Sequence, residues 1–437
     1  MAISPGISRP FRVFVAGGSY GGLAATVHLL DHCSGAKAKA AAVVAAAELQ
    51  SPPPPQPAPE RVPIEVTIVD ERDGFYHLIG TPLAYASESF ASKAWVKFKD
   101  IPALKGQNIH CLQGTVSSID PVAKEATVID SDTKRPSKHS YDFFVGATGL
   151  RREWPSTPRS TRRKNYIFEA ENQITAMASA ASHGGAVIVG GGAVGVEMAA
   201  ELKMCMPSLP VTLVHSRDHL LSAEPLPDEF KEKTLELVKE VGVEVRLNSR
   251  LKSSKPVEVE QAGNEIVPAS AGVELEFEDG STMKAGEVVV AISKAHPSTS
   301  YLPAACLDSE QYALVTPGLS LQPETGVANV EDHFIAGDAA RWTGIKRCGT
   351  AMYMGTFVAN NIFRRIQRTM GKKEEDILKL LELAEIPPMI GVAVGKKGVS
   401  YWPGQGTVAG EEVMEQMFRD DLGFTICWNH MMLGISH

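Results

Sequence analysis

The chain has 437 residues, of which 44% are hydrophobic and 22% charged, as in a folded globular protein of two or three domains. Lys and Arg number 43 against 51 Asp and Glu. The resulting net charge of −8 argues against nucleic acid as a partner, because phosphate binding needs clustered cations. No apolar run reaches the length of about 18 residues that a transmembrane helix needs. The N-terminus also lacks the order of a secretory signal, so we expect a cytoplasmic protein, with peripheral membrane contact left open.

The cysteines and histidines carry no disulfide or metal signature. The six cysteines are scattered without a C-x-x-C pair, which indicates reduced thiols. His215 and His219 have the spacing of a ligand pair on a helix, but they follow a predicted strand, and Asp218 lies between them. We therefore predict no metal site.

The first predicted element is a strand over 12–16, which a glycine-rich turn joins to a helix over 22–32. In a dinucleotide-binding unit the first glycine makes the tight turn and the last lets the helix pack on the strand. The helix N-terminus then favours a pyrophosphate. Ser19 stands where the middle glycine is usual and is small enough to fit. The candidate binding residues of this turn are Gly17, Gly18, Ser19, Gly21 and Gly22.

The second strand, over 65–69, ends at Asp70, an acid placed to bind the adenosine ribose. In an uninterrupted unit this acid follows the turn by about 20 residues. Here an Ala- and Pro-rich insert over 34–63 lengthens the connection. We expect its alanine part to extend the helix and its proline part to form an extended surface loop. A tolerated insertion is the simpler interpretation, and a docking role is the alternative.

A buried strand over 141–147 closes on Thr148 and Gly149, which are further candidates for binding the first cofactor. The stretch 151–164 that follows is basic and contains proline. It is interpreted as a solvated linker, and proximity to an entering anionic cofactor is the alternative.

A second strand–turn–helix unit occupies residues 184–295, and its glycine turn provides Gly190, Gly192 and Gly195. Two such turns imply two dinucleotides in one protein, and electron transfer between them is their natural use. The other elements expected in this unit are a strand over 211–214, a helix over 228–241, a hairpin around 278–281 and a strand over 287–291.

Position 215, directly after the second strand of this unit, indicates the choice of coenzyme. An acid there binds the 2′-hydroxyl of the adenosine ribose and repels a 2′-phosphate. The chain instead has His215, Ser216 and Arg217, which offer a hydroxyl and a guanidinium suited to phosphate. We predict that NADPH is accepted, while a preference over NADH stays open.

A later strand ends in Gly-Asp at 337–338, where Asp338 can accept a hydrogen bond from the ribityl hydroxyls of FAD. A helix over 350–369 and an α/β tail follow. The predicted fold is α/β, with two Rossmann-like dinucleotide-binding domains and a small C-terminal α/β region. The expected domains are a first FAD-binding part over 1–150, an NAD(P)-binding domain over 151–296, a second FAD-binding part over 297–369 and a C-terminal region over 370–437.

The motifs and their order resemble the FAD-dependent pyridine nucleotide-disulfide oxidoreductase superfamily, and within it the apoptosis-inducing-factor-like branch that includes the ferroptosis suppressor proteins. The similarity lies in residues 190–202, 211–216 and 337–362. It implies that Lys346 is an active-site lysine and that Glu197 faces the nicotinamide. It also implies NAD(P)H-to-quinone reduction through FAD, without redox cysteines.

These residues together predict an FAD-dependent NAD(P)H oxidoreductase that passes electrons to a quinone-like acceptor. Glu197 and Lys346 are the catalytic candidates, and we expect them to form a functional pair at the flavin–nicotinamide contact. The expected partner is a small-molecule electron acceptor, and no oligomeric state is indicated. Two alternatives stay open: a redox tailoring flavoenzyme of a specialised metabolic pathway, and an NAD(P)H-sensing signalling flavoprotein.

Overall fold

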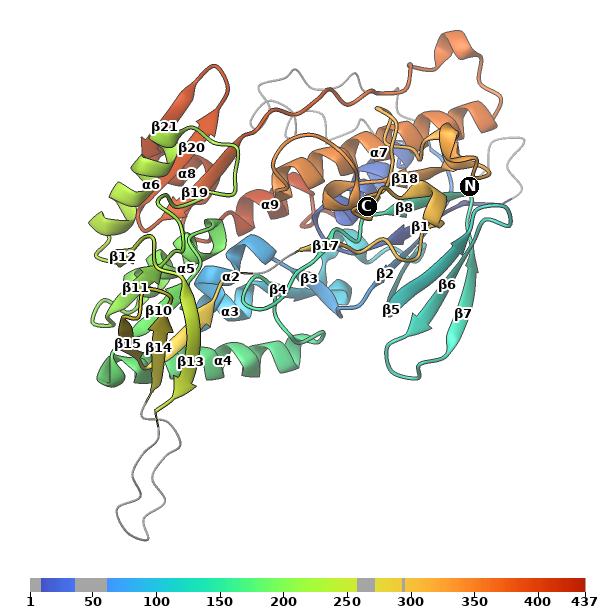
Figure 1. Ribbon diagram of the computed structural model, residues 1–437. Coiled ribbons are helices and arrows are strands. Elements are labelled where there is room, and N and C mark those ends of the chain that lie inside the picture. Colours follow the sequence, from blue (N-terminus) through green and yellow to red (C-terminus); the bar gives the residue numbers. More distant parts are fainter. Residues whose placement is uncertain (1–8, 36–60, 258–271, 293–294, 437) are drawn as a thin grey trace.

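A computed structural model describes residues 9–35, 61–257, 272–292 and 295–436 (Figure 1). Most of the Ala- and Pro-rich insert, including both of its expected conformations, lies outside the described residues. Within the described part, no helix is both long and apolar enough to cross a bilayer.

The first unit is built on a sheet in which seven described strands follow the order β18-β8-β1-β2-β5-β6-β7. The strands from β18 to β5 are parallel, whereas β5, β6 and β7 pair antiparallel. The central strand β1 carries consecutive apolar residues, as expected of a parallel strand covered on both faces. The strands are β1 (Phe11–Ala16), β2 (Ile64–Asp70), β5 (Ile109–Asp120), β6 (Glu125–Asp130), β7 (Pro136–Ser140), β8 (Phe143–Gly146) and β18 (His333–Ile335).

Helices α1 (Tyr20–Cys33) and α7 (Cys348–Thr369) pack against each other beside this sheet (Figure 1). Small residues allow the close approach, since a Cβ built on Gly355 would lie 2.4 Å from the carbonyl oxygen of Gly21. A Cβ on Gly21 would in turn lie 3.3 Å from the oxygen of Ala351. The first glycine turn is therefore clamped by a helix that arrives more than 300 residues later in the chain.

The second unit contains a parallel sheet of order β12-β11-β10-β16 and an antiparallel sheet of order β13-β14-β15. Its elements are α4 (Arg163–Ala180), β10 (Ala186–Val189), α5 (Ala193–Cys205), β11 (Val211–Val214), α6 (Asp228–Glu240), β12 (Glu244–Arg246), β13 (Leu251–Pro256), β14 (Val273–Phe277), β15 (Thr282–Ala285) and β16 (Glu287–Val290).

The C-terminal region forms an antiparallel sheet of order β19-β20-β21, which packs through β19 on α5 and through β20 on α6 (Figure 1). Helix α2 also packs on α5 and connects the first unit to the second. The elements of this region are β19 (Ile390–Val394), β20 (Lys397–Trp402), β21 (Gly406–Gly410), α8 (Glu411–Met417) and α9 (Phe424–His430). The connections between the units contain β3 (Gly74–Tyr76), α2 (Thr81–Ala84), α3 (Glu88–Lys93), β4 (Trp95–Lys97), β9 (Leu150–Arg151) and β17 (His296–Pro297).

The α/β fold with two Rossmann-like units is confirmed, because each glycine turn joins a buried parallel strand to a helix. Strand β18 pairs with β8, so the chain returns to the first sheet after the second unit, as expected. The antiparallel extension β5-β6-β7 was not predicted. The basic stretch 151–164 also differs from a simple linker, since its last two residues begin helix α4.

Candidate functional site

In the first glycine turn, backbone groups of neighbouring segments lie in close contact. Gly17 has a φ of +105°, and a Cβ built on it would lie 2.4 Å from the carbonyl oxygen of Ala147. A Cβ on Gly22 would lie only 1.9 Å from the oxygen of Gly17. Glycine is therefore required at both positions. Ser19 takes the N-cap position of α1, and its side chain does not cap the helix.

Asp70, at the end of β2, closes this turn from the side. Its Oδ2 accepts a hydrogen bond of 2.7 Å from the backbone N–H of Gly18, and its Oδ1 accepts one of 2.8 Å from the N–H of Arg72. Burial raises the pKa of Asp70, while Arg72 and the two N–H donors oppose the shift. The carboxylate thus lies at the carboxyl end of its strand, where it can hold a ribose.

The second turn repeats this geometry. Gly190 has a φ of +121°, and a Cβ on it would lie 2.8 Å from the oxygen of Ala291. A Cβ on Gly195 would lie 1.8 Å from the oxygen of Gly190, and one on Gly192 would meet nothing within 4 Å. Gly192 is equivalent in position to Ser19, so the open space explains why a serine fits in the first turn.

His215 takes in the second turn the place that Asp70 takes in the first. Its Nδ1 lies 3.1 Å from the backbone nitrogen of Gly191, and its Nε2 lies 3.0 Å from Oγ of Ser222. Because the Gly191 N–H donates, Nδ1 must be unprotonated, and the ring is the neutral tautomer with its proton on Nε2. Burial lowers the pKa of His215, which agrees with this state. His215 therefore positions the glycine turn and adds no negative charge.

Ser216 and Arg217 follow directly on the loop after β11. Ser216 is half-buried and Arg217 is exposed. The backbone oxygen of Arg217 accepts a hydrogen bond of 3.0 Å from the N–H of Asn248, which fixes the loop while the guanidinium stays at the surface. An exposed guanidinium next to a hydroxyl can bind a phosphate group.

Thr148 and Gly149 lie where the chain leaves the first unit. The Thr148 hydroxyl donates a hydrogen bond of 2.6 Å to the carbonyl oxygen of Ser298 and lies 3.2 Å from the hydroxyl of Tyr301. Thr148 therefore ties the outgoing segment to the returning one. Gly149 has a φ of +63°, and a Cβ on it would meet nothing within 4 Å.

Asp338 lies in the short 3-10 turn Gly337–Ala339 after β18. Its Oδ2 forms an ion pair of 3.1 Å with the guanidinium of Arg152, and both side chains are largely buried. Arg152 was not among the residues expected at the site, although the basic composition of its stretch was a signal. The pair joins the returning segment to the segment that enters the second unit.

Glu197 lies on α5, two residues after the last glycine of the second turn. Burial raises the pKa of its carboxyl to about 8, although a hydrogen bond of 3.2 Å from the N–H of Ala393 to Oε1 opposes the shift. Burial also raises the pKa of Glu201, one turn further along the helix, to about 7. Helix α5, which carries both carboxyls, packs against the C-terminal sheet through β19.

Lys346 lies in the loop before α7 and does not reach Glu197. Its Nζ donates a hydrogen bond of 2.7 Å to the carbonyl oxygen of Ala340 and lies 5.2 Å from the centre of the Tyr312 ring. Burial lowers the pKa of Lys346, while Asp338 opposes the shift. Among the described residues no hydrogen bond or ion pair joins Lys346 to Glu197. Each side chain binds a backbone group of a different segment, so the two are not in direct contact, and their functional pairing stays a prediction.

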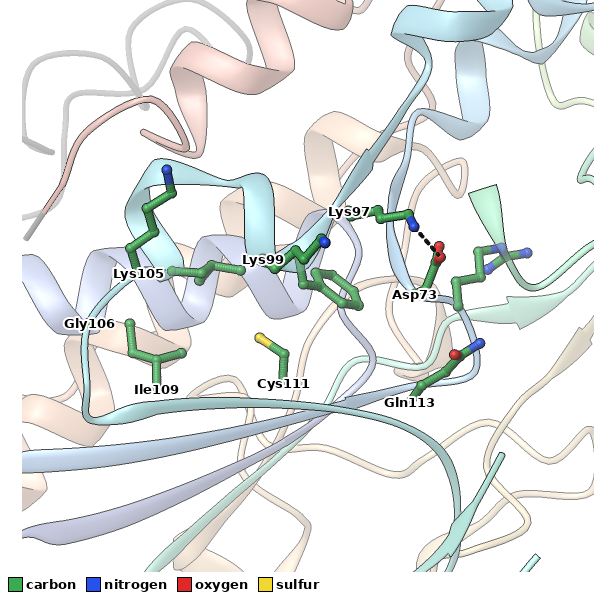
Figure 2. Close-up of a pocket in the computed structure, with 11 residues that line it drawn as sticks. Asp73, Lys97, Lys99, Lys105, Gly106, Ile109, Cys111 and Gln113 are labelled. Atoms are coloured by element: carbon green, nitrogen blue, oxygen red, sulfur yellow. Dashed lines mark ion pairs between the residues drawn. The ribbon is translucent and has the colours of Figure 1, made fainter. Parts of the chain in front are cut away.

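A cavity of about 660 Å³ is lined by Arg72, whose N–H binds Asp70, and by Gln113, which lies opposite Asp70 on β5 (Figure 2). Phe98 connects it with the first turn, since a Cβ on Gly18 would lie 2.5 Å from the end of the Phe98 ring. Figure 2 shows Lys97 directed toward Asp73, and the two groups lie 3.7 Å apart. The cavity can hold the adenosine end of a dinucleotide whose pyrophosphate lies at the first turn. It is lined by Arg72, Asp73, Lys97, Phe98, Lys99, Leu104, Lys105, Gly106, Ile109, Cys111 and Gln113.

The class of the protein follows from a match over most of the chain. Residues 11–355 match the family described as pyridine nucleotide-disulphide oxidoreductase, and the chain belongs to this family. It is therefore a pyridine nucleotide-dependent flavin oxidoreductase, and its cofactors are FAD and NAD(P)H. The two glycine turns and the residues around them fit two dinucleotides.

Individual relatives agree with this class. The chain is 46% identical over 432 residues to oxidoreductase OXR1 of Ajellomyces capsulatus, covering 99% of this chain and 89% of the relative. It is 25% identical over 248 residues to ferroptosis suppressor protein 1 of Homo sapiens, covering 56% of this chain and 54% of the relative.

Solved structures share the fold. The water-forming NADH oxidase of Lactobacillus brevis bound to NADH has a TM-score of 0.58 at 16% identity, covering 89% of this chain and 74% of that one. An engineered water-forming NADPH oxidase bound to NADPH has a TM-score of 0.58 at 15% identity, with 89% and 75% covered.

Proposed function

We propose that the protein transfers electrons from NAD(P)H, with NADPH preferred, through FAD to a quinone-like acceptor. The observation that carries the proposal is the pair of equivalent glycine turns, one closed by the carboxylate of Asp70 and the other by the neutral ring of His215. One turn is suited to a dinucleotide with a free ribose, and the other does not repel a 2′-phosphate.

FAD is assigned to the first turn. The pyrophosphate would lie at the N-terminus of α1 beside Ser19, because the N–H of Gly18 is already bound by Asp70. Asp70 would hold the ribose, and the cavity of Figure 2 would receive the adenine. Asp338 would accept from the ribityl chain, with Arg152 holding its carboxylate in place.

NADPH is assigned to the second turn. The 2′-phosphate would meet the hydroxyl of Ser216 and the exposed guanidinium of Arg217. His215 contributes by holding the N–H of Gly191 without placing a negative charge beside the phosphate. NADH lacks this phosphate and would gain less from Arg217.

The bound flavin supplies a ring that accepts a hydride from the nicotinamide and passes electrons on. Glu197 holds a proton near neutral pH because burial raises its pKa to about 8, so it can donate a hydrogen bond to the carboxamide of the nicotinamide. Lys346 is held by Ala340 and places a positive charge on the side of Asp338. Glu197 thus acts on the nicotinamide and Lys346 acts on the side of Asp338, and the two side chains do not contact each other.

The quinone-like acceptor is supported by the resemblance of residues 190–202 and 337–362 to the apoptosis-inducing-factor-like branch. The chain has no C-x-x-C pair, so electrons are expected to leave the flavin directly to a small molecule.

Stopped-flow absorbance on the purified holoenzyme tests the proposal. Under anaerobic conditions NADPH should bleach the flavin faster than NADH, and menadione should then restore its absorbance faster than dissolved oxygen does. An enzyme that no quinone reoxidises, or that neither nicotinamide reduces, would contradict the proposed function.

A further inference from the structure

Arg347, the residue before α7, has two buried nitrogen atoms that have no hydrogen-bond partner among the described residues. Its Nε and Nη2 make no hydrogen bond within the part of the chain that the structure describes. Both atoms belong to the same edge of the guanidinium, the edge that presents two parallel N–H groups. Buried donors are normally satisfied, so an unpaired edge of this kind points to a ligand.

The guanidinium lies against the C-terminal sheet. Its central carbon is 5.6 Å from the centre of the Trp402 ring, at the end of β20. The backbone of Arg347 is extended, with φ −156° and ψ 159°, and successive side chains of extended backbone point to opposite sides. Lys346 accordingly lies against Tyr312. Arg347 and Lys346 therefore serve different parts of the site.

The same sheet reaches the second unit. In β19, next to β20, the N–H of Ala393 donates to Glu197. The C-terminal sheet therefore connects Glu197 of α5 with Arg347 at the start of α7. Arg347 thus lies against the same sheet that contacts the second unit through Glu197.

The surroundings of Arg347 leave its charge uncompensated. Among the described residues Arg347 forms no ion pair, whereas Arg341 in the same loop pairs with Asp308 and Glu310. In the first turn of α7, Thr350 is 7% exposed, and its Oγ1 also has no partner among the described residues. A free guanidinium edge beside an indole ring suits a planar ligand that carries an oxygen acceptor.

We propose that Arg347 binds a carbonyl oxygen of the quinone acceptor, with Trp402 beside the guanidinium as an aromatic wall. Both N–H groups can converge on the two lone pairs of one carbonyl oxygen. In the overall reaction, NAD(P)H, H⁺ and quinone give NAD(P)⁺ and hydroquinone. Negative charge that develops on the quinone oxygen is stabilised by the guanidinium. This inference rests on the proposed function and names the residue that holds the acceptor.

Separate measurement of the two half-reactions tests the proposal on the holoenzyme. Arg347→Met removes the donors, and Arg347→Lys keeps the charge without the two-donor edge. Reduction by NADPH should stay within about twofold of wild type in both variants. Reoxidation by menadione should slow at least about tenfold in Arg347→Met, as expected for the loss of a charge-assisted hydrogen bond, and less in Arg347→Lys.

A matched control is available in Arg159, whose central carbon lies 4.4 Å from the ring centre of Trp154. Arg159→Met also removes an arginine from a tryptophan ring, and it should leave both half-reactions unchanged. Quenching of tryptophan fluorescence in the oxidised holoenzyme by menadione reports binding without turnover. It should weaken in Arg347→Met while the FAD content and the flavin spectrum stay those of the wild type.

Unchanged reoxidation and unchanged quenching in Arg347→Met would overturn the inference about Arg347 and leave the proposed function in place. A slower NADPH step or a shifted flavin spectrum would also overturn it, because either result places Arg347 on the flavin. A wild-type enzyme that no quinone reoxidises would overturn both the proposed function and this inference.

Discussion

The two glycine turns of the molecule share one backbone shape. Gly17 and Gly190 both have positive φ, at +105° and +121°. In each turn the last glycine packs on the first, with built Cβ-to-oxygen distances of 1.9 Å for Gly22 and 1.8 Å for Gly195. Steric limits on the backbone therefore explain why the same pattern occurs twice.

The contact that closes each turn differs in charge. The N–H of Gly18 is bound by the carboxylate of Asp70, whereas the N–H of Gly191 is bound by the imidazole of His215. A carboxylate at this position binds ribose hydroxyls and repels a 2′-phosphate, while a neutral ring does not repel it. We infer that one backbone shape serves two dinucleotides and that the residue after the second strand decides which phosphates are tolerated.

The helices that follow the two turns also differ, in the residue that each carries at one equivalent position. Two residues past the last glycine, α1 has Ala24, which is completely buried in a helix that packs on α7. The equivalent position of α5 is Glu197, which is bound to the C-terminal sheet. The first helix is built for close packing, and the second brings a titratable group to the nicotinamide side of the proposed site.

The largest expected effect comes from alanine at the last glycine of each turn. Gly22→Ala and Gly195→Ala both force a Cβ into a carbonyl oxygen, which costs about 1–3 kcal/mol or more. Gly22→Ala should lose FAD, measured as flavin absorbance per protein. Gly195→Ala should keep FAD and lose reduction by NADPH about 100-fold, the equivalent of about 3 kcal/mol.

Gly192→Ala is the matched control for stability, since its Cβ would meet nothing within 4 Å. Its Tm should equal that of the wild type. Equal loss of FAD in Gly22→Ala and Gly195→Ala would contradict the assignment of one dinucleotide to each turn.

The next effect concerns the acid of the first turn. Asp70→Ala removes the acceptor of the Gly18 N–H and the proposed ribose contact, and charged hydrogen bonds of this kind contribute about 1.5–3 kcal/mol. The Kd for FAD should rise about 10- to 100-fold, as measured by titration of the apoprotein with FAD. His215→Ala, the equivalent change in the second turn, should leave the Kd for FAD unchanged; a comparable rise would show that the closing contacts act through global stability.

A smaller effect is expected at the surface of the second unit. Arg217→Ala should raise the KM for NADPH about tenfold, because one charge-assisted contact to the 2′-phosphate is lost. The KM for NADH should change little. Lys239→Ala, which removes an exposed positive charge from α6, is the control and should affect neither coenzyme. Equal increases for NADPH and NADH in Arg217→Ala would mean that Arg217 does not touch the 2′-phosphate.

The smallest effect is the pH dependence caused by Glu197. Burial raises its pKa to about 8, so the folded state binds the proton more tightly than the unfolded state does. The stability from this proton is fully present below the ordinary pKa of Glu, about 4.3, and is lost as the pH rises through about 8. Glu197→Gln cannot lose the proton, so its Tm relative to wild type should increase from pH 5 to pH 9 by about 2 °C.

Glu201→Gln is the matched control on the same helix. Burial raises the pKa of Glu201 to about 7, so its relative gain in Tm should level off at lower pH than that of Glu197→Gln. A constant Tm difference between Glu197→Gln and wild type across this range would show that the Glu197 carboxyl titrates normally.

The sequence predicted the parts of the site that depend on local backbone. Short motifs with a steric or topological reason predicted three features. These are the tight turns at Gly17 and Gly190, the acid at the end of β2, and the return of the chain to the first sheet through β18. No element was predicted over β5, although the exposure of its residues from 114 to 120 largely alternates, as in a strand with one covered face.

Contacts between distant segments could not be predicted in the same way. The hydrogen bond from the Gly191 N–H to His215 depends on the rotamer of the His215 ring. The ion pair of Arg152 and Asp338 joins the segment that enters the second unit to the segment that returns from it. The separate backbone contacts of Glu197 and Lys346 are of the same kind, and the functional pairing of these two residues stays a prediction. Nothing in the sequence shows that the backbone N–H of Ala393 donates a hydrogen bond to the Glu197 carboxyl.

Replacement of His215 by aspartate tests the central claim most directly, since the new carboxylate would be the counterpart of Asp70 in the second turn. Stopped-flow reduction of the His215→Asp holoenzyme should show the apparent Kd for NADPH rising at least about tenfold through repulsion of the 2′-phosphate. Binding of NADH should be kept or improved, and the FAD content should be unchanged. An unaltered preference for NADPH in this variant would contradict the claim that the closing contact of the second turn decides the coenzyme.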